Sequence, residues 1–296
     1  MRILLTGANG FLGNSIRKFF AKEQVATLSR SDSNINHDLS AGVPELPLCS
    51  MVIHAAGKAH FVPTSRKHVE EFFNVNVGGT RNLLTGLEKL ATLPKSIVFI
   101  STVAVYGLDT GILINEQASL QAKDPYGLSK IQAEELIQEW CLKNNVTSAI
   151  LRLPLIAGPN PPGNLRSMIS GIQRGYYVNI AGGTARKSMV LADEVAKILL
   201  KAGHVGGIYN LTDGCHPSFA ELSEIIANQL VKSKPRSLPF WVAEVLATIG
   251  DLGGSLAPIN SNKLQKVISD LTFDDSKARE LLGWNPTPVL KGFKII

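Results

Sequence analysis

Ile3-Leu4-Leu5-Thr6-Gly7-Ala8-Asn9-Gly10-Phe11-Leu12-Gly13 is the stretch of sequence that decides the fold. An apolar run, a glycine-rich turn and the start of a helical pattern follow one another, which is the order of a strand, a turn and a helix. Glycines let backbone N–H groups approach a pyrophosphate, and the helix N-terminus adds the positive end of a dipole. The spacing is GxxGxxG rather than GxGxxG. We predict that Gly7, Gly10 and Gly13, with Asn9, Phe11 and Leu12 between them, bind a dinucleotide; the alternative is a purely structural turn.

The order of elements around this turn predicts an α/β fold. Short apolar runs lie at residues 25–28, 51–53, 96–100 and 148–153, and they alternate with helical patterns at residues 11–22, 66–90 and 126–143. Because these runs do not alternate polar with apolar residues, each strand is expected to be buried on both faces. The sequence therefore predicts a Rossmann-type, doubly wound parallel sheet.

The sequence pattern changes after Pro154. Gly158-Pro159-Asn160-Pro161-Pro162-Gly163 is a turn-rich boundary, and shorter helical patterns and loops follow it. We expect residues 1–157 to form an NAD(P)-binding domain to which residues 188–212 return. Residues 158–187 and 213–296 are expected to form a smaller C-terminal substrate-binding region over the carboxyl ends of the strands.

Composition excludes several classes of protein. The 296 residues are 45% hydrophobic and 18% charged, so the chain can bury a sizeable core and is not disordered. The net charge is +6, but no run of five like charges exists, so a solvated basic surface is favoured and nucleic acid is not an expected partner. Cys49, Cys141 and Cys215 lie far apart, which predicts neither a disulfide framework nor a metal site and fits a reducing, cytoplasmic location.

The sequence suggests no integral membrane segment. The N-terminus has only three apolar residues before its first glycine, unlike a signal peptide. The most apolar late stretch, residues 240–256, is interrupted by Glu244, Asp251 and three glycines, so it is too short and too charged to span a bilayer. We expect an amphipathic helix packed on the protein; peripheral membrane contact is the alternative.

The end of the second predicted strand bears on the choice of cofactor. A carboxylate there binds the adenosine ribose and favours NAD, but this chain has Leu28-Ser29-Arg30-Ser31. Because Arg30 can pair with a 2′-phosphate, NADP is favoured over NAD; the alternative is that Arg30 only faces solvent. Asp38, together with Leu39, is expected to contact the adenine edge.

Tyr126-Gly127-Leu128-Ser129-Lys130 is the strongest catalytic signal. Asp124-Pro125 reads as a helix cap and first helical position, so Tyr126 and Lys130 share one helix face at i,i+4. A lysine ammonium near the phenol is expected to lower the pKa of Tyr126 toward neutrality, which suits proton exchange with a sugar hydroxyl or ketone. Thr102, at the end of a predicted central strand, offers a hydroxyl to orient the substrate oxygen.

With these motifs in place, the chain resembles the extended short-chain dehydrogenases/reductases, and within them the NAD-dependent epimerase/dehydratase family that acts on nucleotide sugars. The resemblance runs through most of the chain. Its motifs are residues 6–13 (TGANGFLG), 52–57 (VIHAAG), 76–80 (NVGGT), 101–107 (STVAVYG), 126–130 (YGLSK), 151–154 (LRLP), 275–278 (DSKA) and 282–286 (LGWNP).

The resemblance implies a role for each matching residue. Tyr126 is implied as the acid/base, Lys130 as the residue that holds the nicotinamide ribose, and Thr102 as the third member of the triad. The residues implied to line the cofactor channel are Ala55, Ala56, Gly57 and Asn76, of which Asn76 also braces the active site. Asn164 and Leu165 are implied to meet a nucleotide diphosphate or base, and Arg186 to clamp the diphosphate of a nucleotide sugar, foremost a UDP-sugar. The family also leaves room for a homodimer.

Departures from the family pattern narrow the expected reaction. Val103-Ala104 follow Thr102 where dehydratases of the family carry an acidic pair, so dehydratase activity is not expected. Leu155 stands where many epimerases carry a substrate-binding asparagine. The favoured interpretation is a 4-keto sugar reductase of surface-polysaccharide biosynthesis. The alternatives are a UDP-sugar 4-epimerase and, from another class, a non-catalytic NAD(P)-sensing or scaffold protein.

Overall fold

The glycine-rich turn joins the first strand and first helix of a seven-stranded parallel sheet. The computed structural model describes residues 2–59, 63–251 and 260–295. The strand order is β11-β7-β5-β4-β1-β2-β3, and every neighbouring pair is parallel. The strands are β1 (Ile3–Thr6), β2 (Val25–Ser29), β3 (Ile35–Asn36), β4 (Met51–His54), β5 (Ser96–Thr102), β7 (Thr147–Leu153) and β11 (Gly207–Asn210). The predicted doubly wound sheet is confirmed.

The sheet order places a binding crevice at the carboxyl ends of β1 and β4. The chain leaves β1 toward β2 on one side, and β4 pairs with β1 on the other. Because the connecting helices then lie on opposite faces of the sheet, the turns that follow these strands separate and leave room between them.

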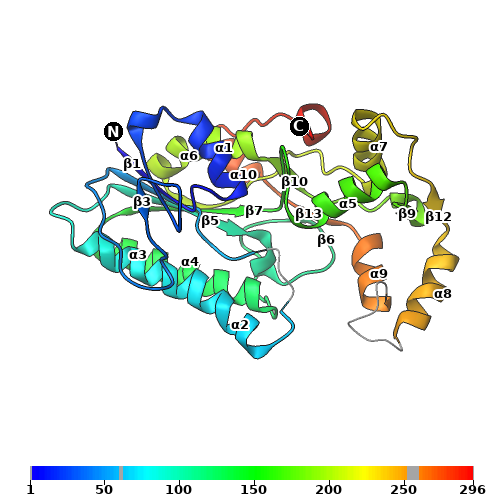
Figure 1. Cartoon of the computed structure of the whole chain (residues 1–296), viewed down its shortest axis with the longest axis horizontal. Coiled ribbons are helices and arrows are strands. Elements are labelled where there is room, and N and C mark those ends of the chain that lie inside the picture. The colour runs from blue at the N-terminus through cyan, green and yellow to red at the C-terminus, as the bar shows by residue number, and fades with distance from the viewer. Residues whose placement is uncertain (1, 60–62, 252–259, 296) are drawn as a thin grey trace.

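Two helical layers cover the sheet, one above it and one below it in Figure 1. The upper layer contains α1 (Phe11–Phe19), α6 (Ala192–Val205) and α10 (Ser276–Leu282). The lower layer contains α2 (Arg66–Phe73), α3 (Gly79–Glu88) and α4 (Pro125–Asn144). Each layer closes its own apolar core against the strands, which explains why nearly all strand residues are buried.

Two predicted helices differ from the observed ones. The helix expected over residues 66–90 is divided by a π-helical turn, η2 (Asn74–Gly78), which sits between α2 and α3 without a break in the helical backbone. Single π-helical turns alter the face that a helix presents at that point. The helix expected over residues 11–22 ends at Phe19, because Phe20 is extended and a 3₁₀ turn, η1 (Lys22–Gln24), leads into β2.

Close packing of the turn explains two of its glycines. Gly7 has φ +68°, and a Cβ there would lie 2.6 Å from the Ala56 backbone nitrogen. A Cβ on Gly13 would lie 2.1 Å from the carbonyl oxygen of Gly7, so α1 packs directly on the turn that precedes it. A larger residue at either position would push β1, β4 and α1 apart.

Much of the chain beyond Pro154 builds a second lobe, at the right in Figure 1, while α6, β11 and α10 belong to the sheet and its upper layer. Its short strands pair β8 (Leu155–Ala157) with β10 (Met189–Leu191), and β9 (Asn179–Ile180) with β12 (Ser237–Leu238). A further pair joins β6 (Gly111–Ile114) to β13 (Leu271–Phe273). The helices after Pro154 outside the two layers are α5 (Gly163–Arg174), α7 (Phe219–Gln229), α8 (Phe240–Asp251), α9 (Ser261–Ile268) and α11 (Val289–Gly292), and the 3₁₀ turns elsewhere are η3 (Val103–Tyr106) and η4 (Ala181–Gly183). Within residues 188–212, β11 is a strand of the main sheet and α6 packs on that sheet, whereas β10 pairs with β8.

The apolar stretch at residues 240–256 forms α8 as far as Asp251, and its last five residues lie outside the described part of the chain. Ala243 and Ala247 pack against Leu264 of α9. Among the helices that the structure describes, none combines the length and the apolar character needed to cross a bilayer.

Candidate active site

A buried ion pair fixes the helix that carries the predicted catalytic residues. Arg152 of β7 binds Glu134 of α4, with 2.7 Å between Nη2 and Oε2, and both side chains are at most 3% exposed. Ser101 of β5 donates to the same carboxylate. The Arg152 guanidinium also donates to the Tyr106 hydroxyl at 3.1 Å, and that hydroxyl donates to Asn210 of β11 at 2.8 Å. These bonds hold α4 against the carboxyl end of β5.

Thr102 and Tyr126 meet at this carboxyl end. Thr102 is the last residue of β5, and its hydroxyl accepts a hydrogen bond from the Ala104 backbone at 3.2 Å. Asp124 caps α4 as the sequence predicts, so Tyr126 falls in the first helical turn, partly buried and 6.1 Å from the Phe72 ring. The Thr102 side chain lies close enough to the Tyr126 hydroxyl to influence its pKa.

The expected pKa of Tyr126 is wrong in direction. Burial raises the pKa of the phenol above its ordinary value of 10.0, and the charge of Asp124 adds to the rise. The nearby Thr102 side chain lowers the pKa of Tyr126 but does not reverse this rise. The lysine that was expected to lower the pKa of Tyr126 directs its ammonium elsewhere.

Lys130 is buried one helical turn beyond Tyr126. Its Nζ donates to the Ile100 carbonyl oxygen at 2.6 Å and lies 4.0 Å from the centroid of the Phe99 ring. Burial lowers the pKa of Lys130 from 10.5 to about 7, although the charge of Glu134 opposes the shift. Lys130 can therefore exchange a proton near neutral pH.

Asn76 ties the loop after β4 to the start of α4. It lies in the π-helical turn η2 and is 2% exposed. Its amide nitrogen donates to the Ser129 hydroxyl at 2.8 Å and to the Lys58 carbonyl at 3.2 Å, and its oxygen accepts from the Lys58 backbone at 2.7 Å. Ser129 in turn donates to the Tyr126 carbonyl at 2.8 Å. A substitution of Asn76 would therefore disturb the first turn of α4.

A cavity of about 700 Å³ lies over the carboxyl ends of β1, β2 and β4. It brings together nine of the predicted cofactor-binding residues, namely Gly7, Asn9, Gly10, Arg30, Asp38, Leu39, Ala55, Ala56 and Gly57. Phe11, Leu12, Gly13, Asn76 and Lys130 are not in its wall. Arg30 and Asp38 are both exposed at its β2 end, where hydrogen bonds from Ser40 lower the pKa of Asp38 and the charge of Arg30 assists.

Sequence reasoning missed two charged residues in this wall. Lys58, directly after the motif at residues 52–57, forms an ion pair with Glu71 of α2. That contact with Lys58 lowers the pKa of the Glu71 carboxyl. The position of Lys58 next to a recognised motif was the available signal, whereas Glu71 reaches the cavity only through the path of α2.

A second cavity, of about 510 Å³, lies in the second lobe. It begins at Leu155, two residues beyond Leu153, which is the partner of Thr102 in the register of β5 and β7. Both Asn164 and Leu165 line this cavity; Leu165 is buried and Asn164 is exposed.

Arg186 does not line the second cavity, although Gly183 does. Its guanidinium donates to the His216 carbonyl at 3.0 Å and lies 3.4 Å from the Glu221 carboxylate. Two lysines of α9, Lys263 and Lys266, line the cavity instead. No local pattern in the sequence marks these lysines, because they reach the cavity only through the fold-back of α9.

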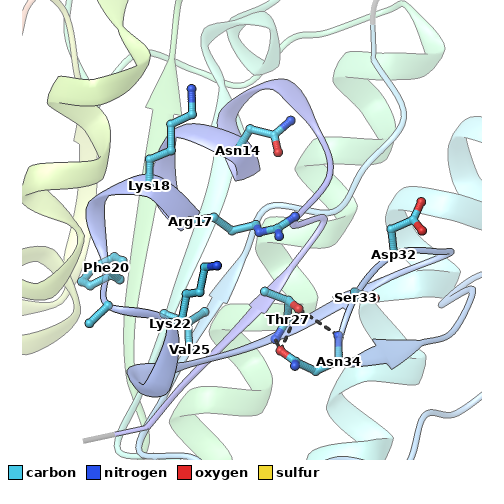
Figure 2. Close-up of a pocket in the computed structure, with 11 residues that line it drawn as sticks. Asn14, Arg17, Lys18, Phe20, Lys22, Val25, Thr27, Asp32, Ser33 and Asn34 are labelled. Atoms are coloured by element: carbon cyan, nitrogen blue, oxygen red, sulfur yellow. Dashed lines mark hydrogen bonds between the residues drawn. The ribbon is translucent and has the colours of Figure 1, made fainter.

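A third cavity, larger than these two, is unrelated to the predicted site residues. Its volume is about 860 Å³, and Figure 2 shows it between α1, β2 and the loop that follows β2. Arg17, Lys18 and Lys22 supply its positive charge, and Asn34 is bonded to Thr27. It contains none of the predicted catalytic, cofactor-binding or substrate-binding residues.

Comparison with protein families gives a match over residues 3–211 to the model described as the NAD dependent epimerase/dehydratase family. The chain is 27% identical over 314 residues to a UDP-glucose 4-epimerase of Vibrio cholerae, covering 99% of this chain and 93% of that protein. It is 26% identical to the N-acetyl-alpha-D-glucosaminyl-diphospho-ditrans,octacis-undecaprenol 4-epimerase of Escherichia coli O157:H7, with 93% and 88% covered. It is also 26% identical to a GDP-6-deoxy-D-mannose reductase of Pseudomonas aeruginosa, with 77% and 79% covered.

Solved structures with the same fold extend over nearly the whole chain. RMD from Pseudomonas aeruginosa, complexed with NADPH, superposes with a TM-score of 0.74 at 20% identity and covers 98% of this chain and 96% of its own. MoeE5, in complex with UDP-glucose and NAD, gives a TM-score of 0.75 at 21% identity, with 99% and 96% covered. At these identities the comparison establishes the fold.

The lowered pKa of Lys130 predicts a pH-dependent stability. Between about pH 7 and pH 10.5 the unfolded chain keeps the Lys130 proton while the folded chain has released it, so stability should rise with pH across this window. We expect the free energy of unfolding of Lys130→Met, relative to that of wild type, to be highest at or below pH 7. This difference should shrink by at most about 5 kcal/mol toward pH 10.5, at about 1.4 kcal/mol per pKa unit. Urea unfolding at pH 6, 7.5 and 9 measures it.

The matched control for this prediction is Lys143→Met, an exposed lysine on the same helix. Its difference from wild type should be flat across the three pH values. Parallel pH curves for wild type and Lys130→Met would contradict the assignment.

Proposed function

Because the chain belongs to the NAD dependent epimerase/dehydratase family, we propose that it is an NAD(P)-dependent nucleotide-sugar oxidoreductase, with 4-keto sugar reduction as its activity. The observation that carries this proposal is the meeting of Thr102 and Tyr126 at the carboxyl end of β5, with Lys130 one turn further along α4. A hydroxyl, a phenol and an ammonium are the groups needed to orient a ketone and move a proton to it.

The glycine turn fits a dinucleotide. Any Cβ at Gly7 would collide with the Ala56 backbone, so this wall of the 700 Å³ cavity is bare backbone beside the start of α1. Exposed backbone N–H groups at a helix N-terminus favour a pyrophosphate. When bound, a nicotinamide cofactor supplies the hydride for the ketone carbon. Arg30 at the far end of this cavity is suited to a 2′-phosphate, which favours NADP, with NAD as the alternative.

Each residue of the proposed triad has a distinct part in the reaction. Tyr126 donates its hydroxyl proton to the ketone oxygen, and Thr102, which lies beside Tyr126, orients the same oxygen. Lys130 binds the cofactor ribose, and its lowered pKa lets it exchange a proton near neutral pH. Asn76 acts through Ser129 and Lys58 and is a positioning residue.

The second cavity is proposed to hold the nucleotide diphosphate of the substrate. Lys263 and Lys266 supply positive charge there, although Lys266 shares its charge with Asp109, 3.0 Å away, and Asn164 offers an amide for the base or the phosphates. A UDP-sugar is favoured, since the UDP-glucose 4-epimerase of Vibrio cholerae is similar over almost its whole length.

One observation favours a second candidate, the UDP-sugar 4-epimerase. Four of the relatives at 26–27% identity are 4-epimerases, while the similar reductase is named for a GDP-sugar. Leu155, an apolar side chain in the wall of the second cavity, favours the reductase, as does Arg30 in the cofactor cavity. Both reactions use the same triad.

The reaction type can be tested with the protein as purified. A reductase should oxidise one NADPH for each UDP-4-keto sugar reduced, should prefer NADPH to NADH, and should carry no tightly bound NAD. Absorbance at the reduced nicotinamide band and mass spectrometry of the released cofactor measure these properties. Tightly bound NAD with C4 inversion of a UDP-sugar and no net NADPH use would instead establish the epimerase.

Removal of the Tyr126 hydroxyl tests the catalytic assignment. We expect Tyr126→Phe to keep the fold and the affinity for NADPH but to lower kcat by about 10²–10⁴, the usual contribution of a general acid or base. The control is Tyr176→Phe, a tyrosine that is 63% exposed at the end of α5. Turnover of Tyr126→Phe within threefold of wild type would rule out the proposed role.

The proposed diphosphate site predicts different effects on UDP binding for substitutions of Lys263 and Arg186. Loss of a charge-assisted contact corresponds to roughly 1.5–3 kcal/mol, so Lys263→Gln should raise the Kd for UDP about 10- to 100-fold without a change for NADPH. Arg186→Gln should raise it less than about threefold, because Arg186 does not line this cavity. Calorimetry with UDP and NADPH measures both. The opposite ranking would support the clamp implied by the family resemblance.

A further inference from the structure

Helix α8 is apolar on the side that faces away from the protein. Trp241, Val245 and Ile249 follow one another at intervals of four residues, so they share one face, and they are 68%, 54% and 61% exposed. Leu246 and Phe240, 46% and 44% exposed, flank this face. In a water-facing amphipathic helix these positions carry polar side chains.

The inward side of α8 is made of small residues. Ala243 and Ala247 are the buried residues of the helix, and they pack against Leu264 of α9, with Ile180 and Leu238 beside them. The bulky side chains of α8 therefore do not contribute to the core of this lobe. Figure 1 places α8 at the far edge of the lobe, where no other labelled element covers its outer side.

The segment that leads into α8 is basic. Lys232, Lys234 and Arg236 are exposed within five residues, and only Lys234 forms an ion pair in the described part of the chain, with Glu224 at 2.7 Å. The exposed acids of α8 are Glu244, which lies beside Trp241 at i+3, and Asp251, whose carboxylate accepts hydrogen bonds from Ser261 at the end of the helix. The outer surface thus combines a cationic segment with an aromatic and aliphatic helix face.

We propose that residues 232–236 and the outer face of α8 dock peripherally on an anionic phospholipid bilayer. Lysine and arginine near a membrane surface attract anionic headgroups, while tryptophan and aliphatic side chains of an interfacial helix enter the headgroup boundary. The proposal concerns the surface of the protein and stands independently of the reaction at Tyr126.

A second copy of the chain is the less favourable occupant. Two-fold pairing through α8 would match the apolar face with itself, but it would offer the three cations of residues 232–236 only Glu244 and Asp251 of the second α8 as negative charge. A face of one 12-residue helix is also small beside the roughly 800 Å² per partner of a stable interface. A bilayer meets both conditions, because it offers negative charge and an apolar interior at the same surface.

Docking through α8 brings the second cavity close to the bilayer. The buried side of α8 packs against α9, and Lys263, Lys266 and Val267 of α9 line that cavity. A substrate held there would therefore react near the membrane surface.

Tryptophan fluorescence tests the proposal at one site. The chain has three tryptophans, and Trp140 and Trp284 are only 8% and 4% exposed, so Trp241 is the reporter of the surface. With vesicles of phosphatidylcholine containing about 30% phosphatidylglycerol we expect a blue shift of the emission and co-sedimentation. Vesicles of pure phosphatidylcholine should bind the protein at least about fivefold less. Equal binding to both vesicles, or binding to neither, overturns the proposal.

Variants separate the helix face from other surfaces. Trp241→Ser with Ile249→Ser, both on exposed side chains, should lower the bound fraction at least about fivefold and leave the Tm and turnover of a soluble UDP-sugar unchanged. Lys232→Gln with Arg236→Gln should remove the preference for the anionic vesicles. The control, Leu142→Ser on α4, replaces a side chain that is 86% exposed and should bind as wild type does.

Two results with these variants would overturn the proposal. One is vesicle binding by the Trp241 and Ile249 double variant equal to that of wild type. The other is a change of its oligomeric state in sedimentation velocity without any change in vesicle binding, which would assign the face to a second copy of the chain.

Discussion

The buried pair of Arg152 and Glu134 is the interaction on which the candidate site depends. Both groups are almost fully removed from water, and removal of one partner from such a pair costs about 3–5 kcal/mol because the other charge is left uncompensated. Here the remaining hydrogen-bonding capacity is used as well, since Ser101 donates to the carboxylate and Tyr106 accepts from the guanidinium. The pair therefore fixes α4 relative to β5 and β7, and the position of Tyr126 beside Thr102 follows from that.

Steric constraint at the glycine turn shapes the other half of the candidate site, the cavity over the carboxyl ends of β1, β2 and β4. Gly7 and Gly13 let β1, β4 and α1 approach so closely that the wall of the cofactor cavity is backbone rather than side chain. Asn76 then links this half to the catalytic half, because its amide bonds both to Lys58 after β4 and to Ser129 in α4. The two halves are joined by a buried polar network, whose members have few alternative partners.

Charge is distributed unevenly between the two lobes of the structure. In the sheet lobe, burial holds the pKa of Lys130 near neutrality and raises that of Tyr126, so desolvation dominates at these two candidate catalytic groups. In the second lobe the lysines of α9 face a cavity, and the basic segment before α8 faces outward. The positive charge of the chain is thus divided among separate local surfaces and is not gathered on a single binding face.

The sequence by itself determined the elements and the family. The apolar run, turn and helix of residues 3–13 predicted β1 and α1, the Asp124-Pro125 cap predicted the start of α4, and the i,i+4 spacing predicted that Tyr126 and Lys130 share a face. These features depend on residues within a few positions of one another, so propensity and periodicity encode them. What only the tertiary structure decided depends on distant residues. It includes the π-helical turn at Asn76, the direction of the Lys130 ammonium toward Ile100, the engagement of Arg186 by His216 and Glu221, and the entry of Lys263 into the second cavity. Burial and partners of this kind arise from the path of the whole chain, which no local pattern specifies.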